Sequence, residues 1–153
     1  MPDKTASEFW DDISGFDTCM FATMDGNRIR SRPMAPYFSE TDHTIRFLAS
    51  RRGHKVDEIN THPDSNVIFA ESGEWMSVSG KTSVTTDAAI IDELWTDEAA
   101  AWLDRGDAIA LIVKAEIAEY WNAEGTLSAS WDAIKSAFTN EKANAGEHQK
   151  LAF

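Results

Sequence analysis

The stretch ASRRGHKVDEI, residues 49–59, gathers cationic side chains and one hydroxyl within an acidic chain. The protein has 14 Lys and Arg against 26 Asp and Glu, a formal net charge of −12, yet half of the 14 cations fall between residues 28 and 55. Ser50 ends a predicted strand, and His54 and Lys55 open a predicted helix. Such a junction leaves backbone N–H groups unpaired, and a phosphate needs only a few converging donors. The stretch therefore indicates a site for a small anionic ligand, with solvated strand and turn charges as the alternative.

The overall charge and the remaining reactive residues argue against several other functions. A net charge of −12 has the wrong sign for binding nucleic acid, so no nucleic-acid partner is expected. The four His residues lack metal-ligand spacing and Cys19 is the only cysteine, so no metal site is expected. We expect Cys19 to be a buried strand thiol and not a nucleophile. No GxSxG motif occurs, and no catalytic residue can be named.

Six tryptophans are the other group of residues that could do chemistry. Trp75 opens a predicted strand and Trp121 ends one. An aromatic ring at such a place either caps the core or stacks on a planar cofactor ring. The other four lie on predicted helices at core-like spacing and are expected to be packing residues: Trp10, Trp95, Trp102 and Trp131.

Hydrophobic periodicity predicts about six strands with helices inserted between them. A helix over 3–16 comes first, followed by a hairpin whose turn contains the Asp25–Gly26 pair. Pro33 and Pro36 indicate that the second strand of this hairpin is an edge, a bulge, or a place where backbone groups are free for another contact. Strands are predicted over 18–24, 29–38, 43–50, 65–72, 75–86 and 107–121, and further helices over 53–62, 88–95, 98–104 and 128–142. The irregular order disfavours a doubly wound parallel sheet and favours a mainly β fold, an antiparallel barrel with peripheral helices.

Length and composition indicate one globular domain over residues 1–153, with 139–153 as a C-terminal docking arm. The best apolar run, at 108–113, is too short for a membrane span, so no membrane partner is expected. The N-terminal stretch MPDKTASEFWDD has no apolar signal region. Together with the single cysteine, this favours a cytoplasmic location.

Five segments in order resemble one family. RSRPMAPYF, FLASRRGHKVDEI, WMSVSGKTSV, IAEYW and the closing GEHQKLAF are similar to motifs of the pyridoxamine 5′-phosphate oxidase-like flavoproteins, and most of all to their general stress protein subfamily. Each motif alone has low specificity. Their order and spacing extend the resemblance from about residue 7 to residue 153, nearly the whole chain.

The resemblance implies a six-stranded antiparallel split β-barrel that forms a homodimer and binds FMN at the subunit interface. FAD, a deazaflavin or a tetrapyrrole are the alternative ligands. The implied cofactor-binding residues are Arg32, His54 and Lys55 at the flavin phosphate, Met34 on the strand that passes the isoalloxazine ring, Leu48, Ala49 and Ser50 along the ribityl-phosphate, Trp75 and Ser77 near the ring or phosphate, and Trp121 as an aromatic from the other subunit.

Two positions depart from the family pattern at the phosphate. Ala49 stands where a hydroxyl residue is frequent and Gly53 where a serine is usual, and each missing hydrogen bond costs about 0.5–1.5 kcal/mol. Arg51 or Arg52 is placed to compensate with a charge-assisted contact. After the EYW strand end, NAEGTLSASWD lacks the R-L-H-type segment that grips pyridoxamine phosphate. A true pyridoxamine phosphate oxidase is therefore not expected.

The expected function is that of an FMN-binding flavoprotein of the general stress type. It would act as a flavin-dependent oxidoreductase on an unknown small molecule, with a reduced nicotinamide or small electrophile as its electron partner. The alternative is a stress protein that binds or sequesters flavin without turnover.

Overall fold

The structure, a computed structural model, describes residues 4–53, 55–123 and 146–153. Its strands are β1 (Cys19–Asp25), β2 (Arg28–Met34), β3 (Tyr37–Ser39), β4 (Thr44–Ser50), β5 (Asp64–Glu71), β6 (Glu74–Thr85), β7 (Ala108–Ala123) and β8 (Gly146–Ala152). Its helices are α1 (Ala6–Ser14), α2 (Lys55–Thr61), α3 (Ala88–Leu94) and α4 (Asp97–Ala100), with a 3-10 helix, η1, at Arg105–Asp107.

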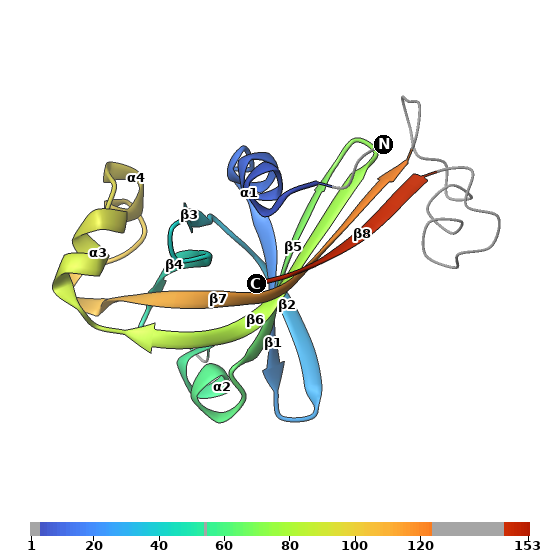
Figure 1. The fold of residues 1–153 in the computed structure, drawn as a ribbon. Coiled ribbons are helices and arrows are strands. Elements are labelled where there is room, and N and C mark those ends of the chain that lie inside the picture. The colour runs from blue at the N-terminus through green and yellow to red at the C-terminus, as the bar shows by residue number, and fades with distance from the viewer. Residues whose placement is uncertain (1–3, 54, 124–145) are drawn as a thin grey trace.

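One sheet of eight strands carries the fold, in the order β2-β1-β5-β6-β7-β4-β3 with β8 added on β7. All of its pairings are antiparallel. The first half of β7 pairs with β4 and its second half with β8, while β6 follows both halves. Figure 1 shows β6 and β7 running from one side of the molecule to the other, with β8 beside the second half of β7. The sheet stays open, as the predicted split-barrel fold requires.

The pairing of β6 with β7 shifts register between Ser79 and Gly80, because their partners on β7 are Ile117 and Ala115 and Glu116 is bulged between them. A Cβ atom at Gly80 would overlap the backbone carbonyl of Lys114 on β7. Only glycine allows the two backbones to approach this closely, which explains the glycine that ends the VSVSG motif.

Two hydrophobic clusters lie on either side of β4. The larger fills the barrel and includes Ala49, whereas the smaller packs the α3–α4 segment against β4 and β7 and includes Leu48. Neighbouring residues of a strand point to opposite faces, so the Leu48–Ala49 pair divides its contacts between the clusters. Helices α1 and α2 lie on opposite sides of β6 and β7 in Figure 1, and both contribute buried residues to the larger cluster.

The first predicted hairpin is confirmed as the antiparallel pair β1–β2, with its turn one residue later than predicted. Its turn consists of Gly26 and Asn27, because Asp25 is still paired with Arg28. Gly26 has a φ of +59°, a conformation that side-chain-bearing residues rarely adopt. Strand β2 is an edge of the sheet, which is one of the alternatives that its prolines predicted.

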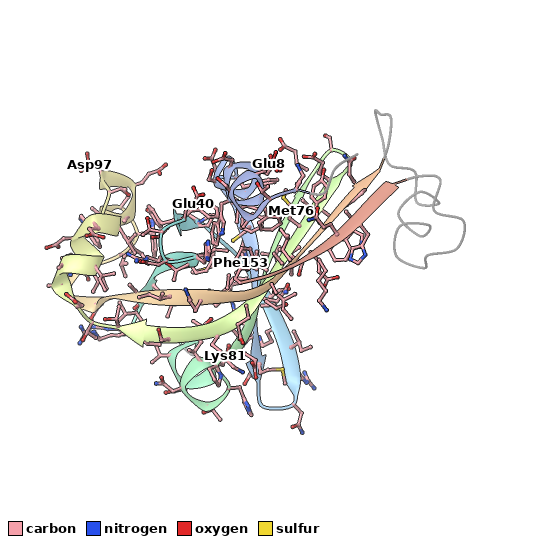
Figure 2. The ribbon with its side chains drawn as sticks, viewed as in Figure 1. Glu8, Glu40, Met76, Lys81, Asp97 and Phe153 are labelled. Carbon is pink, nitrogen blue, oxygen red and sulfur yellow. The ribbon has the colours of Figure 1, made fainter. Side chains whose placement is uncertain are left out.

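The sheet has eight strands where six were predicted, for two separate reasons. The segment predicted as one strand over 29–38 divides into β2 and β3, because two residues including Pro36 break the pairing. The predicted docking arm contains β8, which pairs with the second half of β7. Phe153 follows β8 and packs against Phe9 and Trp10 of α1 near the centre of the fold (Figure 2). The helix predicted over 128–142 lies outside the described residues.

Candidate functional site

A cavity of about 400 Å³ lies between the end of β2, strand β3 and the end of β4. Its volume is within the range of small-molecule and cofactor sites. Four residues that the resemblance implied line it, namely Met34 from β2 and Leu48, Ala49 and Ser50 from β4. The other lining residues are Pro33, Ala35, Tyr37 and Trp102. The structure therefore joins two of the sequence motifs into one mostly apolar pocket.

Trp102 lines the cavity, although its spacing in the sequence predicted a buried packing residue. It was expected to be a packing residue, but it is 62% exposed and lines the cavity. Helix α4 ends at Ala100, so helical spacing does not carry Trp102 into the core. Its backbone is held in a turn, because Trp102 N–H and the N–H of the buried Leu103 both donate to the Ala99 carbonyl, at 3.1 and 2.9 Å.

The turn after β4 uses several of the donors that were expected to remain for a phosphate. Arg51 N–H donates to the Asp107 carbonyl at 2.9 Å and Gly53 N–H to the Ser50 carbonyl at 3.1 Å. Arg52 N–H donates to Ser50 Oγ at 3.2 Å, and the Arg52 side chain pairs with the Asp107 carboxylate at 3.3 Å. Donors for an anion at this turn must therefore come from side chains, including the Ser50 hydroxyl, or from the chain beyond Gly53.

Arg32 belongs to a hydrogen-bonded cluster between the β1–β2 hairpin and α2. Its Nη1 donates to Thr23 Oγ1 at 2.6 Å and its Nη2 to Glu58 Oε2 at 3.0 Å. The Thr23 hydroxyl in turn donates to Glu58 Oε2 at 2.7 Å. Arg32 also lies over the Phe21 ring, 6.0 Å from its centroid. The guanidinium is thus fixed by contacts within the chain, and the Thr23 and Glu58 partners carried no sequence motif that would have revealed them.

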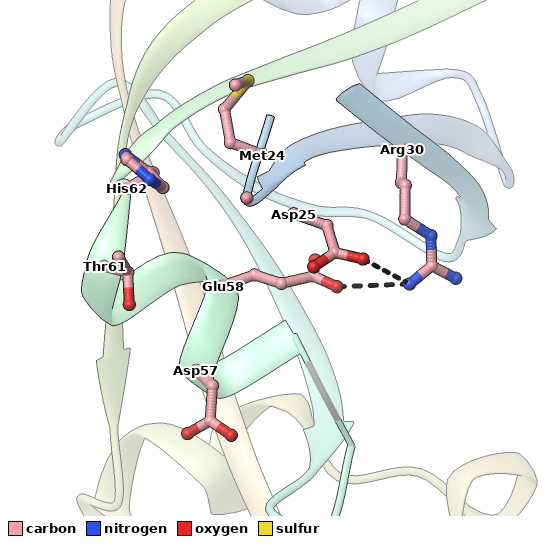
Figure 3. Close-up of a pocket in the computed structure, with 8 residues that line it drawn as sticks. Met24, Asp25, Arg30, Asp57, Glu58, Thr61 and His62 are labelled. Carbon is pink, nitrogen blue, oxygen red and sulfur yellow. Dashed lines mark hydrogen bonds and ion pairs between the residues drawn. The ribbon is translucent and has the colours of Figure 1, made fainter. Parts of the chain in front are cut away.

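Beside this cluster is a second pocket, of about 410 Å³, between the hairpin turn and α2. Glu58 reaches from α2 toward the hairpin, where Arg30 Nη1 lies 3.4 Å from its Oε1 and 3.3 Å from Asp25 Oδ2 (Figure 3). Asp57 points away from this group. Three carboxylates and one arginine are among its eight lining residues, so the pocket does not suit a phosphate.

Two more residues were implied to bind the flavin phosphate, His54 and Lys55. His54 lies outside the described residues. Lys55 is the first residue of α2, and the Glu58 that contacts Arg32 lies one helical turn after it. The backbone arrangement therefore brings the start of α2 and Arg32 to neighbouring parts of the fold.

Trp75, Ser77 and Trp121 lie far from the cavity within one chain. Trp75 and Trp121 are paired across β6 and β7, and the Trp121 ring stacks on His148 of β8 with centroids 5.0 Å apart. Ser77 Oγ accepts a hydrogen bond from Asn66 at 2.8 Å. Ser50 pairs with Ala108 at the other end of β7, roughly 40 Å away along the strand at about 3.3 Å per residue. The two ends of β7 lie at opposite sides of the molecule in Figure 1.

Cys19 is a buried strand thiol, as predicted. It is 4% exposed, and burial raises the pKa of its thiol to about 12. In the part of the chain that the structure describes, no three metal-ligating side chains come together. None of the described helices is long and apolar enough to cross a membrane.

Residues 4–144 match the family described as pyridoxamine 5′-phosphate oxidase like. The chain belongs to this family. No curated protein matches the chain.

Solved structures of similar proteins extend over most of the chain. A protein described as general stress protein 26 from Jannaschia sp. CCS1 is 21% identical, with a TM-score of 0.70 over 96% of this chain and 97% of that one. A general stress FMN/FAD binding protein from Xanthomonas citri is 25% identical, with a TM-score of 0.67 over 82% and 93%. General Stress Protein 26 from Bacillus anthracis str. Sterne is 16% identical, with a TM-score of 0.66 over 72% and 88%.

Proposed function

We propose that this protein binds FMN and serves as a flavin-dependent oxidoreductase for a small molecule. The observation that carries the proposal is the cavity in which Met34, Leu48, Ala49 and Ser50 meet. The similar protein from Xanthomonas citri is named for binding FMN or FAD, which supports a flavin as the ligand.

The residues around the cavity fit the two chemical parts of FMN. Met34 and Leu48 offer apolar walls to a planar ring and would exclude water from it. Arg32 immediately precedes the β2 residues of the wall, and Lys55 follows the turn that begins at Ser50. Cationic residues therefore flank both walls along the chain, where they would hold a phosphate.

The flavin, when bound, supplies hydride and electron transfer. The chain's contribution would be to bind the phosphate, orient the ring and keep water away. Tyr37 carries the only titratable side chain among the described residues that line the cavity. Proton transfer to a substrate would then depend on the flavin, the substrate or groups beyond the described lining.

The separation of Trp75, Ser77 and Trp121 from the cavity supports a homodimer with the flavin at its interface. In a two-fold symmetric dimer, one subunit can present the far end of β7 to the near end of its partner. Trp121 of one chain would then stack on the ring held by the cavity of the other.

Absorbance of the protein purified without added cofactor tests the proposal directly. We expect an oxidised flavin spectrum, the release of FMN on denaturation, and bleaching when a reduced nicotinamide is added. A colourless protein that takes up neither FMN nor FAD would reject flavin binding.

The phosphate contact is tested by comparing FMN with riboflavin. Lys55→Ala should weaken FMN roughly 10- to 100-fold, as loss of a charge-assisted hydrogen bond predicts, and riboflavin far less. Lys81→Ala is the matched control, because Lys81 pairs with Asp64 on the exposed side of β6. Equal losses for both ligands would mean that Lys55 does not touch the phosphate.

The scarcity of titratable groups in the described lining favours one second candidate, a protein that binds or sequesters flavin without turnover. Flavin that binds tightly but is reduced by no nicotinamide donor would select this function. Mass spectrometry of the released ligand would separate FMN from FAD, a deazaflavin or a tetrapyrrole.

A further inference from the structure

Glu58 is a buried carboxylate that accepts hydrogen bonds from three side chains on β1 and β2. Its side chain is 5% exposed, and it accepts hydrogen bonds from Thr23 at 2.7 Å, Arg32 at 3.0 Å and Arg30 at 3.4 Å. Burying a charge is costly unless it is paired, so these contacts explain how an acidic side chain is kept inside the fold. Neither the predicted site nor the cavity includes Glu58.

The Glu58 cluster fixes Arg32 more firmly than Arg30. Arg32 has 17% of its side chain exposed, compared with 53% for Arg30, whose other partner is the exposed Asp25. The two hydrogen bonds of Arg32 use one N–H each from Nη1 and Nη2, and a guanidinium has five N–H donors. Arg32 can therefore be held by Glu58 and Thr23 and still donate to an anion.

The same carboxylate also fixes α2. Glu58 lies one turn after Lys55 on this short helix, so its contacts with β1 and β2 set the rotation of α2 about its own axis. Ile59, which is 1% exposed, anchors the adjacent position in the core. Glu58 thus connects the residue that opens α2 with Arg32.

We infer that Glu58 is a positioning residue of the phosphate site, which holds Arg32 and the start of α2 in the arrangement that receives the flavin phosphate. The inference rests on the proposed function and adds to it a residue that acts through Arg32. Preorganisation of Arg32 strengthens binding because its side chain does not lose further conformational entropy when the phosphate binds. Although Glu58 brings a negative charge to the site, its removal should therefore weaken FMN binding.

The test compares Glu58→Gln with Asp57→Asn by titrating each purified variant with FMN and with riboflavin. Both substitutions remove one negative charge from adjacent positions of α2, but Asp57 is exposed and points away from the cluster. We expect Glu58→Gln to raise the Kd for FMN about 10-fold, as loss of a charge-assisted contact predicts, and the Kd for riboflavin less than about 2-fold. Asp57→Asn should leave FMN binding unchanged or slightly stronger.

A double-mutant cycle with Arg32→Gln separates positioning from a general effect on the fold. If Glu58 acts through Arg32, Glu58→Gln should have little further effect on FMN once Arg32 is replaced. Thr23→Val, which removes a hydroxyl that touches both residues, should give a smaller loss in the same direction and replaces Glu58→Gln if that variant does not fold.

Three results would overturn the inference: FMN binding that is unchanged or tighter in Glu58→Gln, equal losses for FMN and riboflavin, or additive effects in the cycle. Wild-type protein that binds no flavin would instead reject the proposed function and the inference with it. The wild-type titration therefore distinguishes the two failures.

Discussion

The turn between β4 and α2 has room for the side chain that Gly53 lacks. A Cβ atom there would lie 3.4 Å from the Ser50 carbonyl oxygen, an ordinary contact, and the glycine is not in the left-handed region. Gly53→Ser should therefore fold normally and place a hydroxyl beside the proposed phosphate. We expect FMN to bind roughly 2- to 10-fold more tightly, the equivalent of one hydrogen bond, in equilibrium titrations.

Gly53→Ala provides the control for this gain. It adds the same Cβ atom without a hydroxyl, so any improvement that it shares with Gly53→Ser comes from a stiffer backbone. An equal gain for riboflavin and FMN would contradict a contact between the new hydroxyl and the phosphate.

Cys19 makes stability depend on alkaline pH. Burial raises the pKa of its thiol from 9.0 to about 12, so the folded protein holds this proton more tightly than the unfolded chain does. The stabilisation is complete below pH 9.0 and should be lost as the pH rises toward 12. Urea unfolding across this range should show a falling free energy of unfolding, with a shallower slope in Cys19→Ala.

Tyr120 also lowers the free energy of unfolding as the pH rises. In the Cys19→Ala variant the remaining pH dependence would include the contribution of Tyr120. Burial and a hydrogen bond to Glu74 raise the pKa of the Tyr120 hydroxyl. A free energy of unfolding that increases with pH over the alkaline range, or rapid labelling of Cys19 by a thiol reagent in the folded protein, would contradict this account.

Among the strands, the close approach of Gly80 to the backbone of β7 makes this position sensitive to substitution. Gly80→Ala would push a methyl group into the backbone of Lys114, which cannot move without breaking the β6–β7 pairing. We expect a loss of roughly 3 kcal/mol in the free energy of unfolding, measured by urea denaturation. Gly106→Ala is the matched control, because nothing lies within 4 Å of its added Cβ atom. Similar losses in both variants would point to chain entropy instead of the close approach.

Local sequence patterns predicted most of the strands because alternation directly reports one buried face. The pairing of β8 was not predictable in this way, since GEHQKLAF carries no clear alternation and its strand is set by contact with β7. Trp102 was misread because spacing along a helix was assumed to continue past Ala100. The Glu58–Arg32 contact joins residues far apart in sequence, and no local pattern encodes such a pair.

At the scale of the whole molecule, the proposed dimer can be tested by complementation. Lys55→Ala would damage the site of its own chain, whereas Trp121→Ala would damage the site of its partner. A mixed dimer of these two variants would contain one site with both defects and one site with neither. After subunit exchange, about a quarter of all sites should regain wild-type FMN affinity, measured by fluorescence titration.

The expected outcome is different if each flavin site is built from one subunit alone. If Trp121 acts within its own chain, every site in the mixture keeps a single defect and no high-affinity fraction forms. Light scattering of the wild-type protein provides the control, since a monomeric mass with bound flavin would contradict the interface arrangement.

The position of β4 between the two hydrophobic clusters affects how the molecule opens. The α3–α4 segment is attached through the smaller cluster, so it can detach at a lower free energy than global unfolding requires. A molecule in the cavity would touch Leu48 from one cluster and Ala49 from the other, together with Trp102 beside them. A bound ligand would therefore link the two clusters across β4. Its release should lower the free energy needed to detach the α3–α4 segment.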